Sequence, residues 1–187
     1  MSGGKAVFGD DLARVSWALV DSHHRTIGKD FRHKTVEDGQ LYGFYEDAID
    51  VVNGESLDIL IITGSKDIHV VLSAASNDSQ TIPELYESTE VSDNGTEVLA
   101  SNFNRNYEDN PLAKIYKSPT VVDAGFKFVS RRILSGGQGA FRVSSEVVDN
   151  IERVFKANTN YLVRIIADGG GTDIVATGVF YEEEPAE

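Results

Sequence analysis

The stretch SLDILIITGSKDIHVVLSA, Ser56–Ala74, decides the fold class. Its two halves, Ser56–Thr63 and Lys66–Ala74, are rich in β-branched residues and have the length of strands. The dipeptide Gly64-Ser65 between them is a turn signal. Because the connection is so short, we expect the two strands to form an antiparallel hairpin.

Further strands follow on the C-terminal side, separated by turn residues such as Asp93-Asn94-Gly95 and the glycine-rich loop Ser135–Ala140. About eight strands are predicted, and no helical crossover long enough for a parallel sheet lies between them. Pro83 favours an edge strand or a bulge. The additional main strands are expected at Thr81–Thr89, Thr96–Asn104, Thr120–Leu134, Tyr161–Ala167 and Thr172–Tyr181.

This pattern predicts an all-β fold, an antiparallel β-sandwich or jelly roll, with an irregular N-terminal arm. We expect the arm and its extension to cover residues 1–50 and the β-sandwich domain to cover residues 51–187. Two segments could be helical, Asp11–Val20 and Ser144–Phe155, although Ala13–Val20 and the second segment fit short strands as well. We find no internal repeat.

Composition narrows the classes of partner. The chain has 187 residues, and 17 Lys and Arg against 30 Asp and Glu give a formal net charge of -13. An acidic chain lacks the basic face that binding to nucleic acid or to an anionic membrane requires. The absence of cysteine excludes disulfides, thiolate metal sites and thiol nucleophiles. The N-terminal residues do not resemble a signal peptide, and we expect no membrane partner.

Residues that could support catalysis or metal binding are few. His23, His24 and His33 lie close together in sequence, but adjacent histidines on a strand point to opposite faces, so we expect a polar loop and no metal. His69 lies within an apolar strand, where a hydrogen-bonded core or edge histidine is expected. The G-x-S-x-G, H-E-x-x-H and Walker patterns are absent, so we expect no enzyme activity and no cofactor.

Several short elements occur in a characteristic order. They are the pair His23-His24 with the segment to His33, Leu85-Tyr86-Glu87, Asn102-Phe103-Asn104-Arg105-Asn106, SPTVVDAG at Ser118–Gly125, and NTNYLVR at Asn158–Arg164. In this order they resemble a family of structural proteins of tailed bacteriophages, which carry F-N-R-N, G-P-T-V-x-D-A-G-like and N-T-x-Y-L-x-R elements. The chain departs from that pattern at Ser118, where glycine is common, and in its more charged histidine segment.

The resemblance implies a virion component that lies on the capsid exterior and is synthesised in the cytoplasm of the host bacterium. We expect a capsid decoration or cement protein that binds the major capsid protein, stabilises the head and forms a homodimer or homotrimer. The family defines no catalytic residues. The candidate capsid or subunit interface residues are His23, His24, Arg25, His33, Tyr42, Phe44, Tyr45, Arg131 and Arg132.

Two other functions remain open at the level of the sequence. A head-fibre or tail component could bind a host surface glycan through Tyr42, Phe44 and Tyr45, but Trp17 is the only tryptophan, and an interface or core anchor is the favoured role of this cluster. A β-sandwich enzyme acting on polysaccharide lacks any motif support. The pair Arg131-Arg132 suits either a simple surface pair or an acidic patch on a partner.

Overall fold

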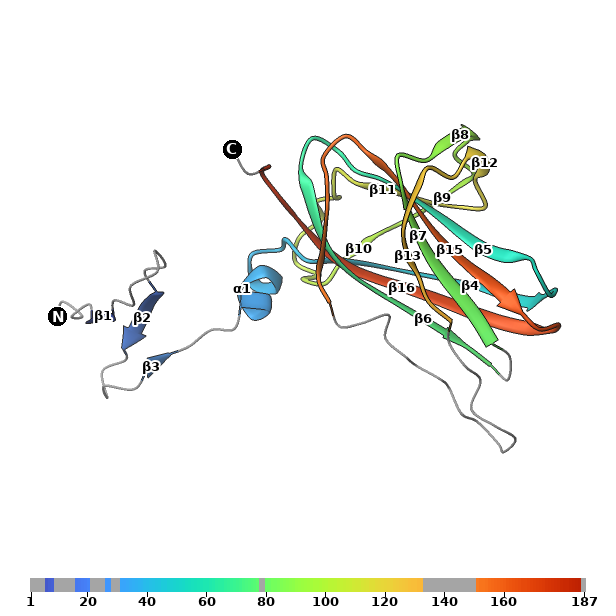
Figure 1. The fold of residues 1–187 in the computed structure, drawn as a ribbon. Helices are drawn as coiled ribbons and strands as arrows, with labels where there is room; N and C mark the ends of the chain where they lie inside the picture. Colours follow the sequence, from blue (N-terminus) through green and yellow to red (C-terminus); the bar gives the residue numbers. More distant parts are fainter. Residues whose placement is uncertain are drawn as a thin grey trace.

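The fold is a β-sandwich, as the sequence predicts (Figure 1). A computed structural model of the chain describes residues 6–8, 16–20, 26–27, 31–77, 80–132 and 151–185. In this part of the chain, the only helix is α1 (Phe31–Glu37), and all paired strands are antiparallel.

Two large sheets form the sandwich. The five-stranded sheet contains, in spatial order, β10 (Ser101–Asn102), β4 (Tyr42–Val51), β16 (Thr172–Glu183), β6 (Asp67–Ser76) and β14 (Arg153–Phe155). The six-stranded sheet contains β13 (Phe126–Ser130), β7 (Gln80–Glu87), β15 (Asn160–Asp168), β5 (Ser56–Ile62), β11 (Lys114–Lys117) and β9 (Thr96–Val98).

Two smaller sheets complete the structure. The strands β1 (Ala6–Phe8), β2 (Ser16–Val20) and β3 (Thr26–Ile27) pair only with one another, on the N-terminal side of α1. The strands β8 (Glu90–Asp93) and β12 (Thr120–Asp123) form a two-stranded ribbon, which Figure 1 shows at one end of the sandwich.

The main strands pair in nested order. The strands β4, β5, β6 and β7 pair with β16, β15, β14 and β13, respectively. Within each of these two runs, consecutive strands alternate between the sheets. Each sheet is then completed at its centre, because β16 also pairs with β6 and β15 also pairs with β7. The strand β16 therefore lies in the interior of the five-stranded sheet, and β15 lies in the interior of the six-stranded sheet.

The predicted hairpin at Ser56–Ala74 is wrong. The strands β5 and β6 exist, but they lie in different sheets, and the connection through Gly64 turns the chain from one sheet to the other. A tight turn between two apolar strands suits both arrangements, and long-range pairing with β15 and β16 decides between them. Pro83 also does not mark an edge, because β7 is paired on both sides; the irregularity lies in its partner β13, between Lys127 and Val129.

The predicted boundary at residue 50 falls inside the sandwich. The strand β4 begins at Tyr42 and is paired on both sides, so the second part of the expected arm belongs to the core fold. Of the two helix candidates, Asp11–Val20 contains the strand β2, and the end of Ser144–Phe155 is the strand β14. Of the rest of the second segment, residues 151–152 are neither helix nor strand, and residues 144–150 lie outside the described residues.

The core lies between the two large sheets. Each strand contributes alternate residues, as in β6, where buried and half-buried positions alternate along its full length. Burial of one such aliphatic or aromatic side chain stabilises the fold by about 1.5–3 kcal/mol. The core side chains that are almost fully buried are Ile59, Ile68, Val70, Ile115, Phe155, Tyr161, Ile165, Ile174 and Phe180.

The ribbon is built from an internal repeat that our sequence analysis missed. The pattern S-x-x-V-x-D-x-G occurs at Ser88–Gly95 and again 30 residues later at Ser118–Gly125. The two copies are related by a local two-fold axis. Val91 pairs with its equivalent Val121, and the pair of Asp93 with Thr120 is equivalent to the pair of Asp123 with Glu90. The burial of the four residues is also the same in β8 and in β12.

Equivalent residues of the two repeats have equivalent roles. The amide N–H of Gly95 donates to Asp93 Oδ1 at 2.9 Å, and that of Gly125 donates to Asp123 Oδ1 at 3.0 Å. Both glycines have positive φ, 87° and 83°. A Cβ on Gly95 would lie 2.2 Å from the carbonyl oxygen of Lys117, so each glycine permits a backbone approach that no other residue allows.

Two leucines on the outside of the six-stranded sheet are buried. Leu60 and Leu162 point away from the core and pair with each other across β5 and β15, yet both are fully buried. The strand β8 links β7 to β9, and β12 links β11 to β13, so both connections run from one side of β15 and β5 to the other. We conclude that the ribbon crosses above the two leucines, which form a small second core.

The close approach at Gly95 can be tested with a matched glycine. Gly54 has the same φ, 87°, but its Cβ position is free of neighbours within 4 Å. Gly54→Ala should destabilise the protein by about 1–2 kcal/mol through backbone strain alone. Gly95→Ala should cost at least about 1 kcal/mol more, because the backbone of residues 117–118 must move. Urea unfolding of both variants measures the difference. Equal losses in the free energy of unfolding would contradict the close backbone packing at Gly95.

Candidate functional site

The predicted histidine segment is only partly described. His23, His24 and Arg25 lie outside the described residues. His33 lies on α1 with an exposed side chain, and its Nε2 is 3.0 Å from Glu37 Oε1, one helical turn away. The contact is local to the helix, so His33 is a surface residue that remains accessible.

The predicted aromatic cluster is divided between the core and the surface. Tyr42 and Phe44 are buried and pack in the core, which is the core-anchor role that the sequence analysis left open for this cluster. Tyr42 stacks on Phe180 with ring centroids 5.7 Å apart, and burial, followed by the charge of Glu182, raises the pKa of its phenol. Tyr45 points outward instead, with 57% of its surface exposed. Successive residues of a strand face opposite sides, which separates Phe44 from Tyr45.

The predicted arginine pair lies at the end of β13. Arg132 Nη1 is 2.8 Å from Asp168 Oδ2 and 3.3 Å from Gln80 Oε1, so this side chain links three neighbouring strand ends. The backbone N–H of Arg131 donates to the carbonyl oxygen of Pro83. Both arginines are exposed. Their contacts are those of a surface pair that also secures the end of the sheet.

The segment 102–106, which contains the F-N-R-N element, anchors the helix that links the arm to the sandwich. Asn102 Nδ2 donates to the carbonyl oxygen of Gly39 at 2.7 Å, and Asn104 Nδ2 donates to that of Glu37 at 3.0 Å. The ring of Tyr107 occupies the space that a Cβ on Gly39 would need. The C-terminal end of α1 is therefore fixed to the sandwich beside β10.

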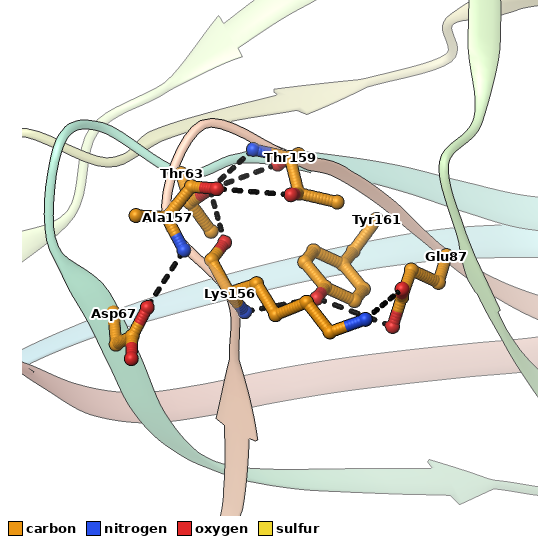
Figure 2. A network of polar contacts seen from close by, with 7 residues as sticks. All are labelled: Thr63, Asp67, Glu87, Lys156, Ala157, Thr159 and Tyr161. Atoms are coloured by element: carbon orange, nitrogen blue, oxygen red, sulfur yellow. Dashed lines mark hydrogen bonds and ion pairs between the residues drawn. The ribbon is translucent and has the colours of Figure 1, made fainter. Parts of the chain in front are cut away.

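The N-T-x-Y element forms the polar clamp shown in Figure 2. The hydroxyl of Thr63 lies 2.7 Å from the carbonyl oxygen of Lys156 and accepts the backbone N–H of Thr159 at 2.8 Å. The backbone N–H of Ala157 donates to Asp67 Oδ1 at 2.8 Å. These bonds join the loop between β14 and β15 to the connection between β5 and β6, and so link the two sheets at one end of the sandwich.

The same clamp extends to Glu87 through Tyr161. The phenolic oxygen of Tyr161 accepts the backbone N–H of Lys156 at 2.9 Å and lies 3.4 Å from Glu87 Oε2. Its ring stacks on Phe155 with centroids 3.9 Å apart. Burial raises the pKa of Tyr161 to about 12, so the phenol stays neutral and retains its proton near neutral pH. This is a structural tyrosine held between aromatic and polar contacts.

Charged side chains on the outer face of the six-stranded sheet form two satisfied groups. Arg164 pairs with Asp58, with Nε 2.9 Å from Oδ1. Glu84 is buried and pairs with Lys127 at 2.7 Å. Burial alone would raise the pKa of Glu84, but Lys127 and the hydrogen bonds from Tyr86 and Ser130 outweigh it and lower the pKa. The carboxylate is therefore held ionised by its partners.

His69 is hydrogen-bonded, as the sequence analysis expected, but it lies on β6 between β14 and β16 and not at an edge. Its Nδ1 lies 2.7 Å from Glu152 Oε1, and its Nε2 lies 3.1 Å from Glu183 Oε2. The ring stacks on Tyr181 with centroids 4.6 Å apart, and Tyr181 in turn donates to Glu152 at 2.7 Å. These contacts link the start of β14 to β6 and β16.

Among residues 33–77, 80–132 and 151–185, no group of three or more His, Asp or Glu side chains has the arrangement of a metal site. In the same part of the chain, no helix is long and apolar enough to cross a membrane. No known protein family, curated protein or solved structure matches the chain. The function therefore has to be argued from the fold and the surfaces themselves.

The clamp in Figure 2 makes a stability prediction. Thr63→Val keeps the shape of the side chain but leaves the amide of Thr159 and the carbonyl of Lys156 without this buried partner. We expect a loss of about 1–3 kcal/mol in the free energy of unfolding. The matched control, Thr96→Val at an exposed position of β9, should change stability by less than about 0.5 kcal/mol. Denaturant unfolding measures both, and an unchanged Thr63→Val variant would show that the clamp contributes nothing.

Proposed function

We propose that this protein is a structural component of a bacteriophage virion, a capsid decoration or cement protein that binds the major capsid protein and stabilises the head. In this proposal its role is to make contacts between subunits, and it is not an enzyme. The observation that carries the proposal is the nested pairing of its eight main strands.

The nested pairing supports a jelly-roll fold. A jelly roll is a long antiparallel hairpin of eight strands rolled into two sheets, and the order of pairs β4·β16, β5·β15, β6·β14 and β7·β13 is the order that such rolling produces. Rolling also brings β16 beside β6 and β15 beside β7. Jelly rolls build viral capsid and lectin domains. In this reading, β8–β12 are an insertion between the two halves of the roll.

The anchored helix provides independent support. An arm that reaches a neighbouring subunit must leave its own domain from a fixed point, and Asn102 and Asn104 fix the end of α1. The net charge of -13 agrees with a protein that must stay soluble before it is assembled. The motif resemblance to phage structural proteins points in the same direction.

The alternative role, a head-fibre or tail component that binds a host glycan, has weaker support. Lectins also use jelly rolls, and Tyr45 offers an exposed ring for stacking against a sugar. However, Tyr42 and Phe44 are buried, so the three-residue aromatic platform that the sequence suggested is reduced to one ring. We therefore favour assembly over glycan binding.

The copy number of the chain in purified virions tests the proposal. Quantitative mass spectrometry of the particles of the phage that encodes it gives the molar ratio to the major capsid protein. We expect hundreds of copies in a simple ratio to the capsid subunit, because a decoration protein repeats with the symmetry of the shell.

Two results would contradict the decoration role. A few copies per particle, in the multiples of three, six or twelve that tails and portals show, would move the protein to the tail and favour glycan binding. Absence from the particle would overturn both virion roles and reopen an enzymatic one. The portal protein of the same particles serves as an internal standard for low copy number.

A further inference from the structure

The repeat of the ribbon continues into the strands on either side of it. Residues 84–98, the first repeat, align with residues 114–128, the second repeat. In this alignment β7 corresponds to β11, β8 to β12 and β9 to β13. The backbone follows the alignment at the start of the ribbon as well, because the equivalent residues Ser88 and Ser118 both have positive φ, 63° and 54°. The two repeats therefore have the same course through the structure.

The two repeats exchange strands with each other. Tyr86 of the first repeat pairs with Lys127 of the second, and the equivalent Tyr116 of the second repeat pairs with Glu97 of the first. These pairs belong to one row that crosses all six strands of the sheet, in the order Lys127, Tyr86, Leu162, Leu60, Tyr116 and Glu97. The row reads the same in both directions except for the charges at its two ends.

The repeats differ in the sign of their charges. Three positions have glutamate in the first repeat and lysine in the second; they are Glu84 and Lys114, Glu87 and Lys117, and Glu97 and Lys127. The Nζ atom of Lys127 is 2.7 Å from Glu84 Oε1. At the equivalent place, the Nζ atom of Lys114 is 3.3 Å from Glu97 Oε1. The same ion pair thus joins the two repeats twice, with opposite polarity.

A second pairing of the same strands competes with the observed one. Because β9 and β13 are equivalent, β7 could pair with β9 through the short link Ser88–Gly95, and β11 could pair with β13 through Ser118–Gly125. These local hairpins close shorter loops than the observed pairs do, and short loops cost less chain entropy and form sooner. Backbone hydrogen bonding alone does not exclude the local hairpins, since equivalent strands offer equivalent partners.

The charges distinguish the two arrangements. In a local hairpin of β7 with β9, Glu97 would replace Lys127 beside the buried carboxylate of Glu84. In a local hairpin of β11 with β13, Lys127 would lie beside Lys114. Both hairpins bring like charges together, and the first also leaves a buried carboxylate without its cation, which is strongly unfavourable. The observed pairing makes both contacts ion pairs.

We propose that the inverted charges of the two repeats select the observed pairing, of β7 with β13 and of β11 with β9, against the local hairpins. A half-exposed ion pair such as that of Lys114 with Glu97 adds little stability by itself. Its sign nevertheless changes the difference in free energy between two competing structures, and specificity depends on that difference. The proposal concerns the folding of the chain and does not rest on a role in a virion.

Cysteine pairs can report which strands are joined, because the chain has no cysteine of its own. Lys117→Cys with Thr96→Cys places two thiols at a pair of the observed structure. Lys117→Cys with Phe126→Cys places them at the equivalent pair of the local hairpin, since Phe126 corresponds to Thr96. Paired residues of neighbouring strands lie within reach of a disulfide. In the observed structure three strands separate β11 from β13, so a 117–126 disulfide identifies the local hairpin.

Reversing the half-exposed ion pair is the decisive test. Glu97→Lys with Lys114→Glu keeps opposite charges in both observed contacts, so the urea midpoint of the folded protein should be unchanged. The same change makes the charges of both local hairpins attractive. We expect the fraction with a 117–126 disulfide, measured by mass spectrometry after refolding with oxidised glutathione, to rise about tenfold over the wild-type background. A fraction equal to that of the wild type would overturn the proposal.

A second variant shares one of these substitutions and inverts the result for the folded protein. Glu97→Lys with Lys127→Glu places like charges in both observed contacts and opposite charges in both local hairpins. Its urea midpoint should be lower than that of the first variant, and its 117–126 disulfide fraction should be higher. Both variants keep the net charge of -13, so a general effect of charge is excluded. Equal midpoints for the two variants would contradict the proposed selection.

Circular dichroism checks that each variant folds before it is oxidised. The 96–117 cysteine pair serves as the matched control, because it should close in the wild-type background while the 117–126 pair stays reduced. Closure of both pairs to the same extent in the wild-type background would show that the charges do not select between the arrangements.

Discussion

Both sheets of this protein depend on the pairing of β15 and β16 with strands from the first half of the chain. The strand β15 lies between β5 and β7, and β16 lies between β4 and β6. Before these two strands are in place, the strands of the first half lack their central partners. Closing such long loops lowers the entropy of the chain before the pairing of the strands compensates for that loss. The topology therefore predicts slow, cooperative folding. The core between the two sheets follows from this arrangement.

Contacts at the periphery of the sandwich stabilise the two sheets that the central strands hold together. The clamp around Thr63 joins the sheets at one end, the asparagines near β10 hold α1, and the duplicated ribbon covers Leu60 and Leu162. Three of the motifs that resemble phage structural proteins coincide with these elements. The physical reason for their residue types is thus local: glycine at positive φ, asparagine amides that bond to backbone carbonyls, and a tyrosine that joins an aromatic stack to a polar clamp.

The sequence predicted the fold class and most of the strands, because alternation and turn residues are local signals. It did not predict which sheet each strand joins, since β5 and β6 are assigned by partners about 100 residues away at Tyr161 and Val179. It placed Tyr42, Phe44 and Tyr45 in one cluster, although the period of two separates them. The repeat in the ribbon escaped notice because only four of its eight positions are identical. The short helix α1 has no acidic residue in its first turn to signal it.

Hydrogen–deuterium exchange at residue resolution tests the central claim most directly. Amides exchange at rates set by the free energy of the opening that exposes them. If β15 and β16 hold both sheets together, their amides should exchange only through global unfolding, and those of β5 and β6 should share the same slow rate. Exchange from β15 and β16 while β5 and β6 remain protected would show that the first half of the chain is stable without them, and would contradict the account.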